Sequence, residues 1–168
     1  RRLQARAFVV LSQQRWQVGF ARASFSVMAG KKYIVSIDQG TTSSRALLVD
    51  VATCTTARIA KADVVQHYPE KQSGWIEHSP EQIWESVYKC VQEVLEGVKD
   101  DVVAFGITNQ RETAIMWNRT TSKPVYPAIV WQDRRTSTYC EQLYGQNHNI
   151  DQVIADKTGL LLDPYFSA

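Results

Sequence analysis

Residues 37–45 read IDQGTTSSR and lie between two apolar runs, YIVSI at 33–37 and ALLV at 46–49. Short β-branched and aromatic runs favour strands, and Gly, Thr and Ser between them favour a tight turn. The stretch therefore predicts a β-hairpin. Its turn combines the Asp38 carboxylate, Gly40, four consecutive hydroxyls and the Arg45 guanidinium, and by composition alone it also suits an ordinary polar turn.

The same residue types favour a phosphate site in this turn. A glycine lets backbone N–H groups approach a phosphate, hydroxyls add neutral donors, and a guanidinium fits phosphate oxygens. A carboxylate beside phosphate is favourable when Mg²⁺ lies between them, which gives Asp38 the role of metal ligand. The pattern is neither a P-loop nor a GxGxxG motif. The candidate phosphate-binding residues are Thr41, Thr42, Ser43 and Arg45.

The rest of the chain alternates strand-like and helix-like segments. Residues 57–66 predict a third strand, 102–107 a buried strand, and 128–131 a further strand, with a hairpin around the turn at 118–122. A helix of about 18 residues is predicted to begin after the cap Ser79, with Gln82 closing a capping box and one apolar face buried. That face contains Ile83, Trp84, Val87, Tyr88, Val91, Val94, Leu95 and Val98. With short helices at 134–144 and 151–155, the pattern predicts an α/β domain with a mixed sheet.

Composition places the 168 residues in the class of one globular domain, or one domain plus a tail. Residues 1–37 contain seven basic residues and no acid, which leaves 12 basic against 17 acidic residues in the remainder, a net charge of −5. This acidic balance disfavours nucleic acid as a partner. No apolar run reaches the length of a membrane span. Three widely spaced cysteines without a CxxC pair indicate reduced thiols and a cytoplasmic location.

Residues 1–30 are predicted to be a leader or transit-like tail without stable structure. Residues 1–27 are rich in Arg and lack acids, as in an organelle transit peptide, but Met28 directly before the first strand also suits a start of translation at that residue. A mitochondrial or other organellar location is therefore the alternative to the cytoplasm. The end of the chain at DPYFSA, without a cap or turn signal, indicates an incomplete domain over residues 31–168.

Four blocks of the sequence resemble those of FGGY carbohydrate kinases in order and approximate spacing, and within the family they are similar to its glycerol-phosphorylating branch. They are YIVSIDQGTTSSRALLVD at 33–50, SGWIEHSPEQIW at 73–84, FGITNQRETAIMWNRTTSKPVYPAIVWQDRRT at 105–136 and TGLLLDPYFSA at 158–168. The resemblance covers residues 31–168. It implies a ribonuclease H-like, actin-like ATPase fold, of which this chain is the N-terminal part of the first domain.

The resemblance also implies site residues. Thr41, Thr42, Ser43 and Arg45 would contact nucleotide phosphates, and Asp38 would lie by the magnesium. Arg111 and Glu112 would contact the polyol, with Trp131 over its apolar side and Tyr165 completing the site. A carboxylate accepts hydrogen bonds from hydroxyls and a guanidinium donates them, so this pair suits a diol. A surface ion pair is the alternative reading of Arg111 and Glu112. Trp75, Glu77 and His78 are expected to be structural. Asp133 in WQDRR departs from the commonest wording of the family, and this departure is expected to have little effect.

The activity implied is ATP-dependent phosphorylation of glycerol to glycerol 3-phosphate, with ATP and Mg²⁺ as cofactors and a homo-oligomeric full-length protein. The aspartate base and the adenosine pocket of the family are expected downstream of residue 168, so these 168 residues alone are predicted to be inactive. The alternatives are a pentulose or gluconate kinase of the same family, an actin-like or chaperone-type ATPase, and a catalytically inactive binding fragment.

Overall fold

The computed structural model describes residues 32–70 and 72–166, which form two compact units. One unit contains the described residues up to Asp63 together with Trp84–Asn109. The other contains Val64–Ile83 and the chain from Gln110 onward. The leader predicted for residues 1–30 lies outside the described residues.

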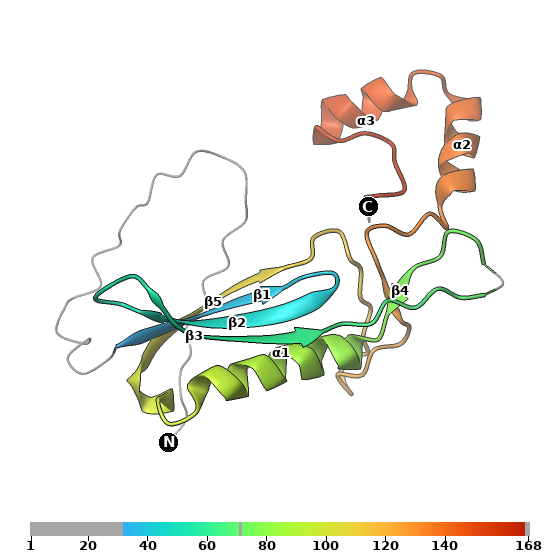
Figure 1. Ribbon diagram of the computed structural model, residues 1–168. Coiled ribbons are helices and arrows are strands. Elements are labelled where there is room, and N and C mark those ends of the chain that lie inside the picture. The colour runs from blue at the N-terminus through green and yellow to red at the C-terminus, as the bar shows by residue number, and fades with distance from the viewer. Residues whose placement is uncertain (1–31, 71, 167–168) are drawn as a thin grey trace. The chain divides into compact units, whose positions relative to one another are not determined.

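The first unit is built on a four-stranded mixed sheet, whose long strands lie side by side in Figure 1. β1 pairs antiparallel with β2 and parallel with β5, and β2 pairs antiparallel with β3, giving the order β3-β2-β1-β5. This confirms the predicted hairpin, the third strand and the mixed α/β sheet. The strands are β1 (Tyr33–Gln39), β2 (Ser43–Asp50), β3 (Thr56–Asp63) and β5 (Val102–Asn109).

The long helix α1 (Pro80–Leu95) begins where the capping signal predicts. The backbone N–H of Gln82 donates to Ser79 Oγ at 3.2 Å, which satisfies one of the free donors of the first turn. The Ser79 hydroxyl also donates to Glu81 Oε2 at 3.0 Å. From Trp84 on, α1 lies along one face of the sheet in Figure 1, and the short 3-10 helix η2 (Lys99–Asp101) leads into β5.

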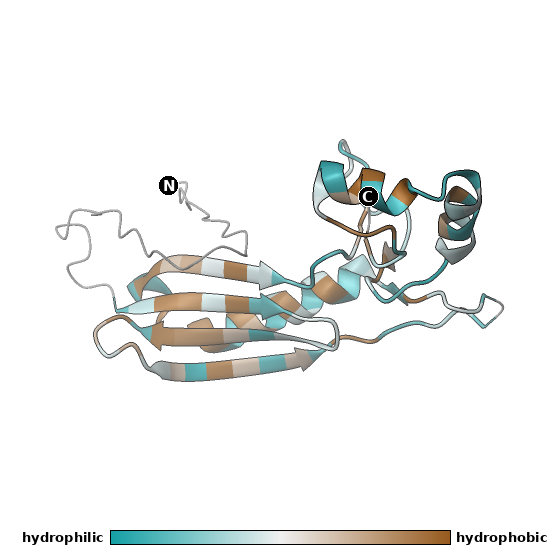
Figure 2. Cartoon of the chain, turned by 90° about the horizontal axis from the view of Figure 1, so that it is seen from above, coloured by the Kyte–Doolittle hydropathy of each residue, from teal (hydrophilic) through white to brown (hydrophobic). Residues whose placement is uncertain are grey.

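The core lies between α1 and the sheet. Side chains alternate between the two faces of a strand, so every second residue can face the helix. Figure 2 shows hydrophobic and hydrophilic residues in bands along the strands. The Ser44 and Ser86 hydroxyls hydrogen-bond at 2.7 Å in this interface, which satisfies both buried groups. The buried apolar residues are Val35, Ile37, Ala46, Leu48 and Ala60 of the sheet with Cys90 and Val94 of α1.

Two burial predictions are wrong in this unit. Trp84 and Tyr88 are 66% and 54% exposed and stack on each other with ring centroids 6.1 Å apart. The eight apolar positions span a wider arc than the helix face that meets the sheet, and that face is centred on Ser86, Cys90 and Val94. β5 was predicted to be buried, but it is an edge strand of the described sheet, and its Phe105 and Ile107 are exposed.

The second unit has little sheet. Its strands β4 (Glu77–His78) and β6 (Ala128–Ile129) pair antiparallel over two residues each, and its helices are α2 (Ser137–Gln146) and α3 (Ile150–Thr158). The predicted hairpin around 118–122 is a tight turn with one isolated bridge, Trp117 to Pro124, rather than two strands. Across the part of the chain that the structure describes, every helix is too short or too polar to cross a lipid bilayer.

Candidate functional site

The hairpin turn between β1 and β2 is tight. The backbone N–H of Gly40 donates to the Ser43 carbonyl at 2.9 Å. A Cβ at Gly40 would lie 3.0 Å from that same oxygen, so a larger residue there would push the turn apart. The structure thus brings the four predicted phosphate ligands onto one short turn and its outgoing strand.

The predicted phosphate ligands differ in how open they are. Thr42 and Arg45 are exposed, Thr41 is half-buried, and Ser43 is only 6% exposed. The neighbouring Ser44 faces the helix, and its backbone carbonyl accepts a hydrogen bond from Cys90 Sγ at 3.4 Å. Thr42 and Arg45 are therefore the groups of this set that an incoming anion meets first.

Asp38 and Arg45 face each other across the β1–β2 ladder. Arg45 Nη1 lies 3.8 Å from Asp38 Oδ2, and both side chains are about half exposed, so this ion pair is loose. A single open carboxylate fits a Mg²⁺ ion that takes its other ligands from phosphate and water. Within residues 32–70 and 72–166 no cluster of three or more His, Cys, Asp or Glu could hold a metal without such help.

The predicted polyol residues lie in the second unit, where Arg111 and Glu112 form the turn that follows Gln110. Glu112 has φ = 61°, in the left-handed region that residues other than Gly, Asn and Asp rarely adopt. The Thr113 hydroxyl donates to Gln110 Oε1 at 2.9 Å, and this hydrogen bond joins the two residues that flank the turn. Residues other than glycine that adopt the left-handed conformation are found most often at binding sites, because the surrounding contacts there stabilise the strained backbone.

A cavity of about 130 Å³ brings two of these residues together. Its lining includes Glu112 and Tyr165, with Phe166, Asp133 and Arg135. The Trp131 ring lies against Tyr165, with centroids 5.5 Å apart and planes at 67°. Arg111 is exposed and does not line the cavity, so it is adjacent to the cavity through its neighbour only.

In the wall of the cavity, Asp133 is the centre of a buried polar cluster that no sequence pattern predicts. Asp133 is 3% exposed and accepts hydrogen bonds from the Ile76 N–H at 2.7 Å and from the Arg135 side chain at 2.8 and 2.9 Å. Arg135 also pairs with Glu77 at 2.8 Å and stacks 3.7 Å above the Trp75 ring. The partners of Asp133 lie up to 57 positions away in the sequence, so no local pattern shows them.

The pKa shifts agree with this geometry. Burial acts to raise the pKa of Asp133, but hydrogen bonds from Arg135 and from the Ile76 N–H outweigh it and hold the pKa below its ordinary value. Burial likewise opposes the charged form of Arg135, and Asp133 and Glu77 outweigh it, which raises the pKa of Arg135. Both groups are therefore charged at neutral pH.

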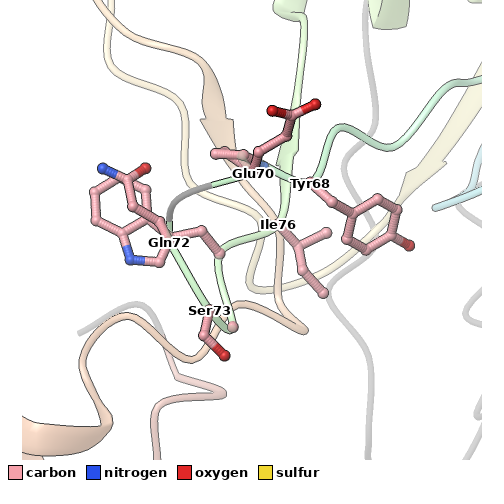
Figure 3. A pocket seen from close by; sticks show the side chains of 8 residues that line it. Tyr68, Glu70, Gln72, Ser73 and Ile76 are labelled. Carbon is pink, nitrogen blue, oxygen red and sulfur yellow. The ribbon is translucent and has the colours of Figure 1, made fainter.

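A larger hollow of about 590 Å³ is lined by residues 68–70 and 72–76. The labelled side chains of Tyr68, Glu70, Gln72 and Ser73 point in different directions in Figure 3 and do not converge on one point. None of the predicted site residues lines it. The smaller cavity at Glu112 and Tyr165 is therefore the stronger candidate for a ligand site, because it gathers polar and aromatic groups from several segments.

Comparisons with known proteins show which family the sequence resembles. The profile of the FGGY family of carbohydrate kinases, N-terminal domain, matches residues 33–168. The glycerol kinase of Rhizobium meliloti (strain 1021) is 49% identical over 138 residues, which are 80% of this chain and 27% of that protein. The glycerol kinase of Shewanella frigidimarina (strain NCIMB 400) is 51% identical over 144 residues, 84% of this chain and 28% of that protein. The chain thus spans little more than a quarter of the length of these relatives.

Solved structures show the same fold. The Plasmodium falciparum glycerol kinase with ADP is similar with a TM-score of 0.71 and 35% identity, over 81% of this chain and 27% of that one. The gluconate kinase of Lactobacillus acidophilus gives a TM-score of 0.70 at 20% identity, over 80% of this chain and 26% of that one, and this likeness bears on the fold alone. The predicted actin-like ATPase fold is confirmed by these neighbours.

Proposed function

The chain belongs to the FGGY family of carbohydrate kinases, and from this membership we propose that the full-length protein transfers the γ-phosphoryl group of ATP to a terminal hydroxyl of glycerol. The products are glycerol 3-phosphate and ADP. The observation that carries the proposal is the gathering of Glu112 and Tyr165 on one cavity, with Trp131 against the Tyr165 ring.

On the polyol side, the Glu112 carboxylate accepts hydrogen bonds from two neighbouring hydroxyls, and Arg111 donates to hydroxyl oxygen from the same turn. The Trp131 and Tyr165 rings cover the carbon chain, and the phenol adds one polar contact at the edge. Such a set binds a short polyol in one orientation.

On the nucleotide side, the turn at Gly40 brings backbone N–H groups to the phosphates, and the hydroxyls of Thr41, Thr42 and Ser43 add donors. The Arg45 guanidinium binds phosphate oxygen as a charged fork. Asp38 would hold Mg²⁺, which when bound neutralises phosphate charge. When the nucleotide enters, Arg45 exchanges its loose contact with Asp38 for the phosphate.

In the transfer, the glycerol oxygen bonds to the γ-phosphorus, the bond to the β–γ bridging oxygen breaks, and ADP leaves with the electron pair. The hydroxyl proton passes to a base that the family resemblance places outside residues 1–168. This segment therefore contributes binding and orientation, and turnover requires the full-length protein.

A coupled assay of ADP release by the full-length protein tests the proposal, with glycerol, xylulose and gluconate compared in parallel. The kcat/KM for glycerol is expected to exceed the others about 100-fold or more, because a site built for three carbons positions larger acceptors poorly. A preference for xylulose or gluconate would contradict the substrate, and no turnover of any acceptor would contradict the kinase.

We further propose a cytoplasmic, homo-oligomeric enzyme that uses Mg²⁺. Cys54, Cys90 and Cys140 are free thiols in the structure, which is compatible with a reducing compartment. Sedimentation of the full-length protein measures the oligomeric state, and titration of EDTA into the assay measures the metal requirement.

A further inference from the structure

Three polar side chains form a hydrogen-bonded chain behind the polyol residues. The backbone N–H of Trp131 donates to Thr113 Oγ1 at 3.4 Å, and the Thr113 hydroxyl donates to Gln110 Oε1 at 2.9 Å. The Gln110 amide nitrogen lies 3.2 Å from His78 Nδ1. His78 is completely buried, and Gln110 is nearly so. The chain thus joins β4, the turn after β5 and the segment after β6.

The direction of the donors fixes the state of the histidine. Trp131 donates to Thr113, Thr113 donates to Gln110, and the Gln110 amide has only N–H groups left for His78. Nδ1 must therefore accept, which requires a neutral ring with its proton on Nε2. Burial, and secondly the charge of His67, lower the pKa of His78, which favours this neutral form.

Stability alone does not explain a histidine at this position. Its Nε2 is the one buried side-chain nitrogen or oxygen without a hydrogen-bond partner in the described part of the chain. An unpaired buried N–H is unfavourable, and an aliphatic side chain of similar volume would avoid it. What the imidazole provides here is the acceptor Nδ1 for Gln110.

The chain ends at the predicted polyol residues. Arg111 and Glu112 are the only residues between Gln110 and Thr113, so the hydrogen bond from Thr113 to Gln110 closes the turn that carries them. Glu112 is held in the left-handed region within this turn, with φ = 61°. The Thr113 oxygen also receives the N–H of Trp131 and so links the aromatic side of the site to the same turn.

We propose that His78 is a positioning residue for the polyol site. Its Nδ1 orients the Gln110 amide, and through Gln110 and Thr113 it sets the turn of Glu112 and the backbone of Trp131. This inference rests on the proposed function and adds to it a residue that does not touch the substrate.

The test uses the full-length protein with His78→Leu, His78→Asn and, as a matched control, the exposed His148→Asn. Leu keeps the volume and removes the acceptor, whereas Asn places an oxygen near the position of Nδ1. His78→Leu is expected to raise the KM for glycerol about tenfold or more with the KM for ATP within twofold, and with an unchanged thermal midpoint. His78→Asn is expected to return the glycerol KM to within about threefold of the unsubstituted protein, and His148→Asn to change nothing.

A second pair keeps the inference testable if His78→Leu does not fold. Thr113→Val removes the hydroxyl that links Gln110 to Trp131, and Thr113→Ser retains it. Only the Val variant is expected to raise the glycerol KM. An unsubstituted protein that phosphorylates no acceptor overturns the proposed function and this inference with it. If the protein is active, three results overturn this inference alone. The KM for glycerol could be unchanged by His78→Leu, it could be unchanged by Thr113→Val, or His78→Asn and His78→Leu could raise it equally.

Discussion

The predicted nucleotide hairpin and the predicted polyol cavity are held together by different forces. The hairpin is part of a regular ladder in which β1 pairs on both sides, and its turn is closed by a backbone hydrogen bond at Gly40. The cavity lies in a unit with two-residue strands, where side chains such as Asp133 and Gln110 bond backbone and side-chain groups far along the sequence. The first region therefore depends on register and the second on a few buried polar groups.

The two regions should also respond differently to substitution. Many equivalent hydrogen bonds of the β-ladder stabilise the hairpin, so a surface side chain there can be replaced without loss of the fold. In the cavity unit the buried Asp133 carboxylate accepts four hydrogen bonds from Ile76 and Arg135, so its loss leaves several donors unsatisfied.

The largest effect is expected from Asp133→Asn. This change leaves the buried Arg135 guanidinium facing an amide N–H₂ group, and breaking a buried pair in this way costs about 3 kcal/mol. Urea unfolding of the full-length protein, followed by tryptophan fluorescence, measures the loss. Asp63→Asn is the matched control, because Asp63 pairs with Lys61 at the surface at 2.8 Å and should change nothing measurable. Equal stability of the two variants would remove the contrast.

Glu112→Gln comes next. It keeps the shape of the side chain and removes the charge that accepts from the polyol hydroxyls, a loss of about 2 kcal/mol in transition-state binding. The kcat/KM for glycerol should fall about 30-fold, with the KM for ATP unchanged. Steady-state kinetics of the full-length protein give both constants. Gln142→Glu, on the exposed surface of α2, controls for a change of charge in the same unit.

Acid should reduce the difference in the free energy of unfolding between the unsubstituted protein and the Asp133→Asn variant. The folded pKa of Asp133 is lowered, so its contribution is complete above the unfolded pKa of about 4 and is lost as the pH falls through the folded pKa. The difference in unfolding free energy measured at pH 7 should decrease below pH 4, by at most about 1.4 kcal/mol per pH unit. A constant difference from pH 7 to pH 2 would show that the carboxylate is not stabilised by its partners.

The smallest effect is expected from relieving the backbone at Glu112. Asn tolerates the left-handed region, so Glu112→Asn should raise the free energy of unfolding by about 0.5 kcal/mol while glycerol binding is lost. Ser122→Asn, at φ = 57°, should give a similar gain with glycerol kinetics unchanged. Thermal unfolding of both variants measures the gain. A gain at Ser122 without one at Glu112 would mean that the turn of Glu112 is not strained.

The same contrast explains what the sequence could predict. The hairpin, the third strand and the start of α1 at Ser79 follow local rules of turns, alternation and capping, and all three are confirmed. The same local rules predict that Trp84 and Tyr88 are buried, but they do not determine how much of the α1 surface the sheet covers, and both side chains are exposed. The Ile76 N–H that bonds Asp133 and the Glu77 carboxylate that pairs with Arg135 belong to a segment far earlier in the chain, which only tertiary structure brings close.

The site residues divide along the same line. A motif in one turn, such as Gly40 to Arg45, is visible in the sequence because its parts are consecutive. The association of Glu112 with Tyr165 crosses 53 positions, and the resemblance to a family rather than any periodicity suggested it. His78 was expected to be structural, and its burial agrees, but its link to Gln110 had no sequence signal.

The central claim is that the hairpin binds the nucleotide and the cavity binds the polyol. Isothermal calorimetry on the full-length protein with Arg45→Ala and Glu112→Gln, titrated separately with ADP and with glycerol, tests it most directly. We predict that Arg45→Ala weakens the binding of ADP about tenfold and leaves the affinity for glycerol unchanged. Glu112→Gln is predicted to weaken the binding of glycerol about tenfold and to leave the affinity for ADP unchanged. If either variant weakens both ligands equally, or if Glu112→Gln weakens ADP alone, the assignment of the two regions is contradicted.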